Sequence, residues 1–129
     1  MRKINKIIIH CSDSDNPRHD SVSVIDSWHK EKGYKGVGYH YFIRSSGKLQ
    51  YGRPIGDIGS HCLGHNQDSI GICLAGKKMF HPAQFGTLKH LLESLDFTLR
   101  VNKVFGHCDF DPVNRSYCPG FDYKKILGL

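Results

Sequence analysis

Several features that would assign a chain to a special class are missing from this sequence of 129 residues. It contains no run of about 18 apolar residues, so no segment is expected to insert into a membrane. Only the short apolar run Ile7–Ile9 follows the basic start at Arg2 and Lys3. A signal peptide needs an apolar core of about 7–15 residues, so the chain is expected to be made in a cytoplasm without an export signal. Internal repeats, linkers and low-complexity segments are also missing.

The cysteine pattern excludes two further classes. Five cysteines are an odd number, and without a secretory signal they argue against a full disulfide framework. Neither a C-x-x-C pair nor an H-E-x-x-H motif occurs, so the two most familiar sequence signatures of zinc proteins are absent. Many other triples of histidine and cysteine therefore remain as possible metal ligands.

The charge is unbalanced towards the basic side. There are 18 Lys and Arg residues against 12 Asp and Glu residues, which gives a net charge of +6 with histidine neutral. Such a balance implies an anionic partner or surface. A nucleic-acid-binding protein would need a basic stripe with aromatic platforms or a paired Cys/His finger, and the sequence shows neither. We therefore expect no nucleic acid partner, and the charge alone does not choose between the anionic surfaces that remain, a bacterial cell wall or lipid headgroups.

Hydrophobic periodicity and turn residues predict a mixed α/β domain. Short β-branched runs predict strands, and apolar residues at three- and four-residue spacing predict helices. The expected strands are 6–10, 39–44, 49–51, 69–75 and 101–105; the expected helices are 23–32, 82–100 and 122–127; the long loops are 52–67 and 106–120. This order favours a mixed central β-sheet flanked by helices in one domain of residues 1–129.

Three residues with metal-binding side chains lie at or just after predicted strands. His10 ends the first strand, His107 follows the last, and Cys118 comes eleven residues after His107. Two imidazoles and one thiolate suit zinc, and three protein ligands leave a fourth position for water. Spacing alone leaves an alternative open, in which His10 is a hydrogen-bonded core residue and Cys118 a small buried one.

Six segments in one order carry a resemblance to a known family. They are Ile7–Ser12, Trp28–Lys30, Gly36–Tyr41, Gly59–Asn66, Ser69–Leu74, and Gly106–Asp109 together with Cys118–Asp122. Together they resemble the type 2 N-acetylmuramoyl-L-alanine amidases, a family that includes amidase-type phage lysozymes and the peptidoglycan recognition proteins. The resemblance runs from about residue 5 to residue 125, nearly the whole chain.

The resemblance implies a zinc hydrolase acting on peptidoglycan. It implies that His10, His107 and Cys118 hold one zinc ion, that Tyr39 is catalytic, and that the amide between the muramic acid lactyl group and L-alanine is cleaved. A phenol is a neutral hydrogen-bond donor at pH 7 and suits a developing oxyanion. His61 and Asn66 match a family pattern near the substrate groove, although a loop histidine is also often a plain surface residue.

One departure from the family concerns a second catalytic helper. Phage members often carry a lysine two residues before the ligand cysteine, where this chain has Ser116, with Arg115 one residue earlier. Either side chain is a candidate helper. A hydroxyl brings no charge, and a guanidinium cannot act as a general acid near neutral pH.

Two broader expectations complete the reading. A non-catalytic peptidoglycan-recognition module is the alternative function, but such modules usually lack a zinc ligand, and this chain has all three. A monomeric phage or prophage endolysin, acting on the wall after the inner membrane is breached, is the favoured setting. The histidines without a motif, at positions 19, 29, 81 and 90, are expected to be solvated.

Overall fold

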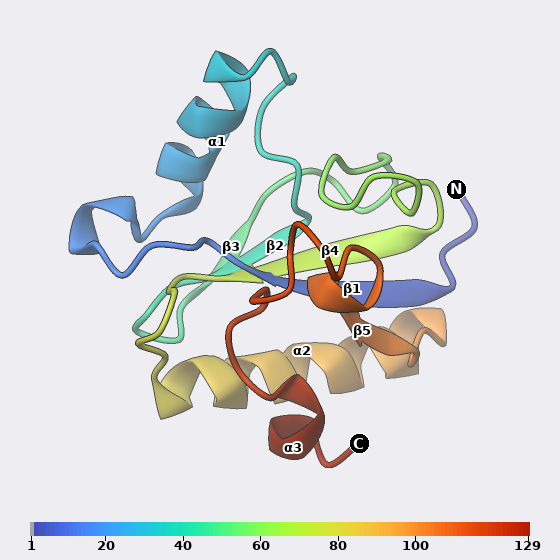
Figure 1. The fold of residues 1–129 in the computed structure, drawn as a ribbon. Helices are drawn as coiled ribbons and strands as arrows, with labels where there is room; N and C mark the ends of the chain where they lie inside the picture. The colour runs from blue at the N-terminus through green and yellow to red at the C-terminus, as the bar shows by residue number, and fades with distance from the viewer. Residues whose placement is uncertain (1) are drawn as a thin grey trace.

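A five-stranded sheet forms the centre of the computed structural model, which describes residues 2–129; Met1, the first residue of the predicted domain, lies outside the described residues. The strand order is β3-β2-β4-β1-β5 (Figure 1). The strands are β1 (Lys6–Cys11), β2 (Tyr41–Ile43), β3 (Leu49–Tyr51), β4 (Ser69–Leu74) and β5 (Val104–Gly106). All neighbours pair in parallel except β2 and β3, which form an antiparallel hairpin at one edge. The predicted mixed sheet is confirmed.

The two central strands have nearly continuous apolar sequences because both of their faces are covered. Every residue of β4 is buried, and so is every residue of β1 after Lys6. In the β1–β4 register Ile9 lies opposite Ile72, and His10 lies opposite Cys73. Parallel strands buried on both sides need helices above and below the sheet.

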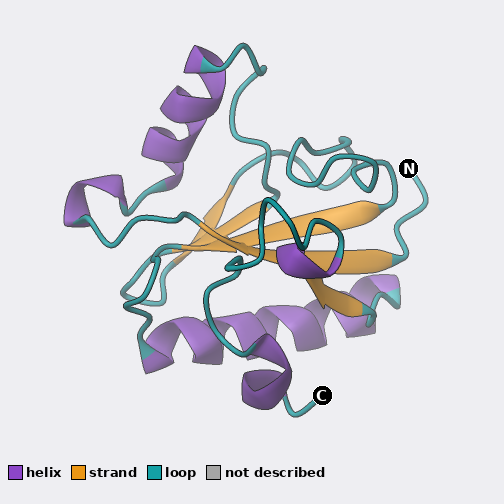
Figure 2. Cartoon of the chain, in the orientation of Figure 1, coloured by secondary structure: helices purple, strands orange, loops and turns teal. Residues whose placement is uncertain are grey.

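Helices lie on both faces of the sheet (Figure 2). Helix α1 (Val22–Glu31) begins at Ser21, whose hydroxyl accepts the Val24 amide hydrogen. Helix α2 (Pro82–Leu99) ends at Arg100, which adopts a left-handed conformation. The short helix α3 (Tyr123–Leu127) lies on the same side as α2 (Figure 1).

The core has two parts, one for each face of the sheet. The larger part packs α2 and α3 against the sheet, and the smaller part packs α1 against the opposite face. The larger cluster includes Ile7, Ile9, Ile70, Ile72, Leu74, Leu88, Leu91, Leu95 and Tyr123; the smaller includes Ile25, Phe42, Cys73 and Ala75. The sheet is therefore anchored firmly enough to fix the groups at its strand ends.

Two strands are shorter than the sequence pattern predicts. The strand expected at 39–44 pairs only over Tyr41–Ile43, and the one expected at 101–105 pairs over Val104–Gly106. Val101 is buried and apolar, but its amide bonds back to the Leu95 carbonyl at the end of α2, so it belongs to the helix-terminating turn. Apolar character records burial and does not by itself distinguish strand from turn.

The long loops contain little regular structure, as predicted. Residues 52–67 form turns and bends. Of the loop predicted at 106–120, Gly106 ends β5, and the rest contains only a single 3₁₀ turn at His107–Asp109. No helix within residues 2–129 is long and apolar enough to span a membrane.

Candidate metal centre and cleft

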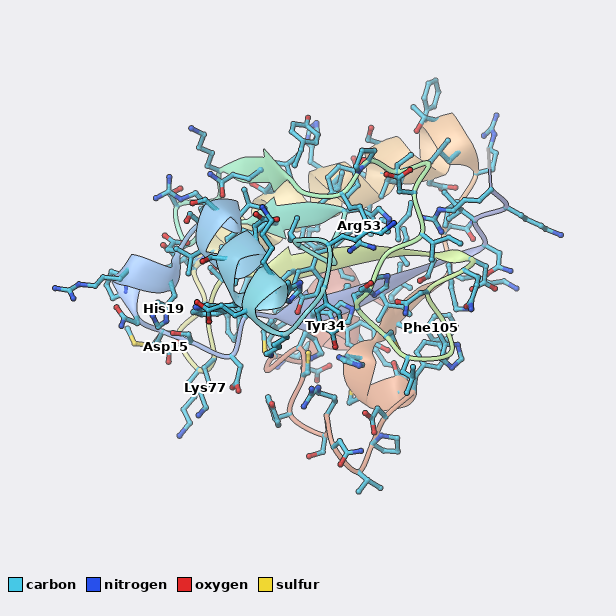
Figure 3. All side chains as sticks on the ribbon, turned by 90° about the horizontal axis from the view of Figure 1, so that it is seen from above. Asp15, His19, Tyr34, Arg53, Lys77 and Phe105 are labelled. Atoms are coloured by element: carbon cyan, nitrogen blue, oxygen red, sulfur yellow. The ribbon has the colours of Figure 1, made fainter. Side chains whose placement is uncertain are left out.

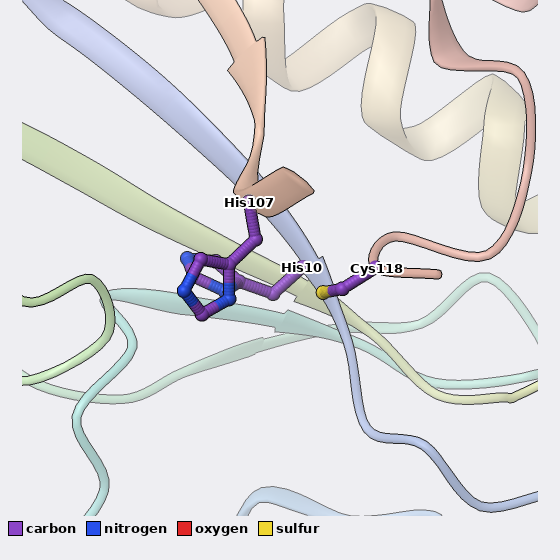
Figure 4. Close-up of side chains that lie close together, drawn as sticks. All are labelled: His10, His107 and Cys118. Carbon is purple, nitrogen blue, oxygen red and sulfur yellow. The ribbon is translucent and has the colours of Figure 1, made fainter. Parts of the chain in front are cut away.

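The three predicted metal ligands come together at one end of the sheet. His10 lies near the carboxyl end of β1, His107 directly follows β5, and Cys118 approaches from the loop before α3 (Figure 4). One donor atom from each residue lies within 4.8 Å of the other two. Strands β1 and β5 are parallel neighbours, so their carboxyl ends share one edge, where α/β proteins commonly bind ligands.

The two imidazoles face each other across the centre of this trio. The Nδ1 atoms of His10 and His107 are 3.0 Å apart. Burial, followed by the nearby His61 and His107 rings, lowers the pKa of His10 well below its usual range. Burial and the neighbouring Arg115 lower the pKa of His107 to about 4. Both rings are therefore neutral near pH 7, the form that binds a metal ion.

Cys118 supplies the soft ligand. Its side chain is buried, and its Sγ accepts a hydrogen bond of 3.3 Å from the Cys11 amide. The adjacent Cys11 thiol and burial raise the pKa of the Cys118 thiol. A bound cation reverses this preference, because a coordinating thiol is deprotonated.

The donor set fits zinc. Zinc lies about 2.0–2.3 Å from imidazole nitrogen and thiolate sulfur, so two ligands of one ion lie about 3–4 Å apart. The 3.0 Å and 4.8 Å bounds of the His10, His107 and Cys118 trio are close to that range. Hydrophobic packing alone does not explain why two neutral imidazoles and a buried thiol lie this close together.

Tyr39 lies beside this trio, just before β2. Its ring centroid is 5.0 Å from that of His10 and 5.5 Å from that of His29. Burial, followed by the neighbouring thiols of Cys73 and Cys118, raises the pKa of Tyr39 well above its usual range. The phenol therefore stays protonated and can donate a hydrogen bond at the site.

A cleft of about 910 Å³ opens over the trio on the α1 side of the sheet. Trp28 and Tyr34 line it from α1 and the segment that follows, and Asn114, Arg115 and Tyr117 line it from the other side. Figure 3 looks down on this face, with Tyr34 labelled. The cleft is large enough for an extended segment of a polymer and leads directly to the predicted ligands.

The structure separates the two candidate helpers before Cys118. Arg115 lines the cleft, whereas Ser116 lines a neighbouring hollow with Lys77 and Phe121. The Cys118 amide bonds to the Arg115 carbonyl at 3.1 Å, so the residues between them lie in a turn. Of the two candidates, Arg115 is the one that lines the cleft.

His61 and Asn66 lie beside the trio but are already engaged within the protein. The Asn66 Oδ1 accepts the amide hydrogens of His61 and Cys62, both at 2.9 Å, and so fixes this loop. His61 is only 7% exposed, and its Nδ1 is 2.9 Å from the His10 Nε2. Both residues line the cleft, and the sequence could not reveal the contact between two histidines 51 positions apart.

Two histidines expected to be solvated contribute to the cleft instead. The His29 Nδ1 accepts the Gly38 amide hydrogen at 2.7 Å and so helps to hold the segment that carries Tyr39. His19 packs edge-on against Trp28. His81 and His90 are exposed, as predicted.

A pair of residues that the sequence did not single out supports His107. The Asp109 carboxylate accepts hydrogen bonds from the Gly106 amide and from the Tyr123 hydroxyl. Burial and this carboxylate raise the pKa of Tyr123 to about 12. The contact ties the 3₁₀ turn that begins at His107 to α3.

Comparisons with known proteins agree with this arrangement. The model of the N-acetylmuramoyl-L-alanine amidase family matches residues 1–121. The chain is 35% identical to an endolysin of Klebsiella phage KP32, over 96% of this chain and 85% of the relative. It is 36% identical to an endolysin of Enterobacteria phage T3, over 92% and 82% of the two chains. Among solved structures it is similar to the N-acetylmuramoyl-L-alanine amidase LysC from Clostridium intestinale URNW, with a TM-score of 0.87 and 29% identity over 98% and 85% of the chains.

Proposed function

We propose, from the premise that this chain belongs to the N-acetylmuramoyl-L-alanine amidase family and is an amidase, that residues 1–129 form one zinc-dependent catalytic domain. The bond cleaved is the amide that joins the lactyl group of N-acetylmuramic acid to L-alanine in peptidoglycan. His10, His107 and Cys118 hold one zinc ion. The observation that carries this proposal is the convergence of these three side chains, two of which, His107 and Cys118, line the cleft.

The chemistry follows from the donor set and the groups around it. A zinc ion with three protein ligands has an open position, and when bound it supplies a Lewis acid and lowers the pKa of water to about 7. Tyr39, kept protonated, donates a hydrogen bond to the oxyanion that develops on the amide carbonyl. Such a donor contributes about 10²–10³-fold to the rate in other hydrolases.

Arg115 is proposed to bind and orient the substrate. It lines the cleft, and the positive charge of a guanidinium group attracts the carboxylates of a peptide stem. It cannot deliver a proton near pH 7, which leaves Tyr39 as the donor for the chemical step. The complete ligand set and Tyr39 favour catalysis over a recognition module that only binds peptidoglycan.

The setting we propose is a monomeric phage or prophage endolysin that is made in the host cytoplasm and acts on the bacterial wall. The endolysins of two phages are the relatives that support it, and the net charge of +6 suits an anionic wall. Sedimentation at several protein concentrations tests the monomer, which should show one species throughout.

Digestion of purified peptidoglycan tests the reaction. The protein should release new L-alanine amino termini, lose that activity with a chelator and regain it with zinc. His107→Ala should abolish it, whereas His90→Gln, at an exposed position on α2, should not change it. New reducing sugar ends in place of amino termini would show that the wrong bond has been assigned. Metal analysis that finds no zinc in freshly prepared active protein would contradict the metal site.

A further inference from the structure

The ring of His61 lies between a proposed metal ligand and a buried serine. Its Nδ1 is 2.9 Å from the His10 Nε2, and its Nε2 is 3.2 Å from the Ser69 Oγ. All three side chains are buried, at 7% exposure or less. The contact is made on the edge of the His10 ring opposite the Nδ1 that faces His107.

The Ser69 hydroxyl determines which ring nitrogen of His61 carries a hydrogen. Ser69 donates to the His65 carbonyl, with its Oγ 2.6 Å from that oxygen. Two oxygens this close need a hydrogen between them, and a hydroxyl has only one to give. Ser69 can therefore only accept from His61, so the Nε2 of His61 carries a hydrogen.

The same reasoning assigns the hydrogen that lies between His61 and His10. The His61 ring is buried and its two partners are another imidazole and a hydroxyl, neither of them an anion, so the ring is neutral and its Nδ1 is a hydrogen-bond acceptor. The His10 Nε2 must then donate to it, and the neutral His10 ring has its lone pair on Nδ1. That atom lies 3.0 Å from the His107 Nδ1, on the side of the proposed metal site.

We propose that His61 is a positioning residue that, together with Ser69, fixes His10 in the tautomer whose Nδ1 can bind the metal ion. Metal-binding histidines commonly donate their second ring N–H to a carboxylate, a carbonyl or a water. Here another imidazole takes that place and is itself oriented by a hydroxyl. In the opposite tautomer of His10, a hydrogen would occupy the metal-facing nitrogen.

This assignment rests on the proposed zinc site, and it changes the role expected for His61. Both of its ring nitrogens have protein partners, so the ring has no free nitrogen for a substrate. Gly71 makes the placement possible, because a Cβ there would lie 2.6 Å from the His61 Cγ. The contacts among His10, His61 and Ser69 could not be predicted from the sequence, because these residues come from β1, the long loop and the start of β4.

Two substitutions of equal shape test the acceptor at His61. In His61→Asn the amide oxygen takes the place of Nδ1, whereas His61→Leu has the same branching and no acceptor. Zinc dissociation constants are measured by chelator competition on the zinc-loaded proteins. The leucine variant should bind zinc about 10–100-fold more weakly than the unaltered protein, and the asparagine variant should stay within about threefold of it. Equal losses in both variants would overturn the proposal and indicate packing alone.

Long-range proton–nitrogen NMR of the unaltered zinc-loaded protein provides a test that needs no variant. We expect hydrogens on the Nε2 atoms of both His10 and His61, and in the metal-free Ser69→Ala variant the His61 ring should lose its single tautomer. A hydrogen found on the His61 Nδ1 would overturn the proposal, whereas zinc binding and amidase activity would still support the proposed function. Failure of the unaltered protein to bind zinc would overturn both.

Discussion

Gly71→Ala probes the support of the metal site without altering any group that touches metal or substrate. Gly71 lies inside β4 with no positive φ, so alanine meets no backbone penalty there. Its new Cβ would instead lie 2.6 Å from the His61 Cγ and 2.9 Å from its Nδ1. Contacts under 3.0 Å are essentially never seen, so the ring or the strand must shift.

The size of the effect of Gly71→Ala follows from how tightly the His61 ring is packed. To reach an ordinary contact of 3.4 Å, the ring must retreat by about 0.8 Å. It is held by His10 at 2.9 Å and by Ser69 at 3.2 Å, and a shift of that size can stretch either bond beyond hydrogen-bonding distance. Overpacking of this kind costs about 1–3 kcal/mol of folding free energy. A lost partner of a metal ligand costs about 10–100-fold in metal affinity.

Denaturant unfolding with and without zinc separates the two effects. The metal-free protein reports the packing cost. The additional stability from zinc should fall by about 1.4 kcal/mol for each tenfold loss of affinity when zinc is in excess. Gly86→Ala is the matched control: Gly86 lies in α2 with nothing within 4 Å of a new Cβ, and alanine there should stabilise the protein by about 0.5–1 kcal/mol. If Gly71→Ala left both the stability and the zinc affinity unchanged, the crowding argument would be wrong.

Three other perturbations give equally specific outcomes. Tyr39→Phe should lower kcat for muropeptide hydrolysis by about 10²–10³-fold and leave zinc affinity unchanged, and an unchanged kcat would remove Tyr39 from the reaction. Gln84→Leu should cost about 1–3 kcal/mol in urea unfolding, because it leaves the Ala75 carbonyl without the side-chain donor at 2.8 Å; no loss would show that water replaces that donor. Burial lowers the pKa of His40 to about 4, so the unfolded chain binds more protons than the folded chain between pH 6.5 and pH 4. The free energy of unfolding should therefore decrease as the pH is lowered through that window. At pH 4.5 His40 should account for about 2–3 kcal/mol of the lost free energy of unfolding. Between pH 7 and pH 4.5 the free energy of unfolding should therefore vary less steeply with pH in His40→Gln than in the unaltered protein, and equal slopes would contradict this.

The elements that could be predicted were those with strong local patterns. The β-branched run before His10 and the heptad-like leucines of α2 have enough periodicity to identify a strand and a helix without tertiary information. The residues at which strand pairing begins and ends were less predictable, because β5 pairs only opposite Ile7–Ile9 of β1.

The candidate metal ligands could be predicted for a different reason. His10, His107 and Cys118 carry the side chains that zinc prefers, and the strand ends at which two of them lie were visible in the sequence. Spacing alone could not choose them from nine histidines and five cysteines. The register of six segments with a known family provided that choice, and the structure then brought the three side chains together.

By itself, the sequence determined the ligand types, the approximate ends of the strands and the basic charge, because each is a property of neighbouring residues or of composition. Only the tertiary structure decided that Arg115 lines the cleft and Ser116 does not, because one backbone turn separates their directions. It also decided that His61 contacts His10 across 51 residues. Hydrogen bonds between distant segments depend on how the chain packs, and no local pattern records which distant nitrogen a buried ring will meet.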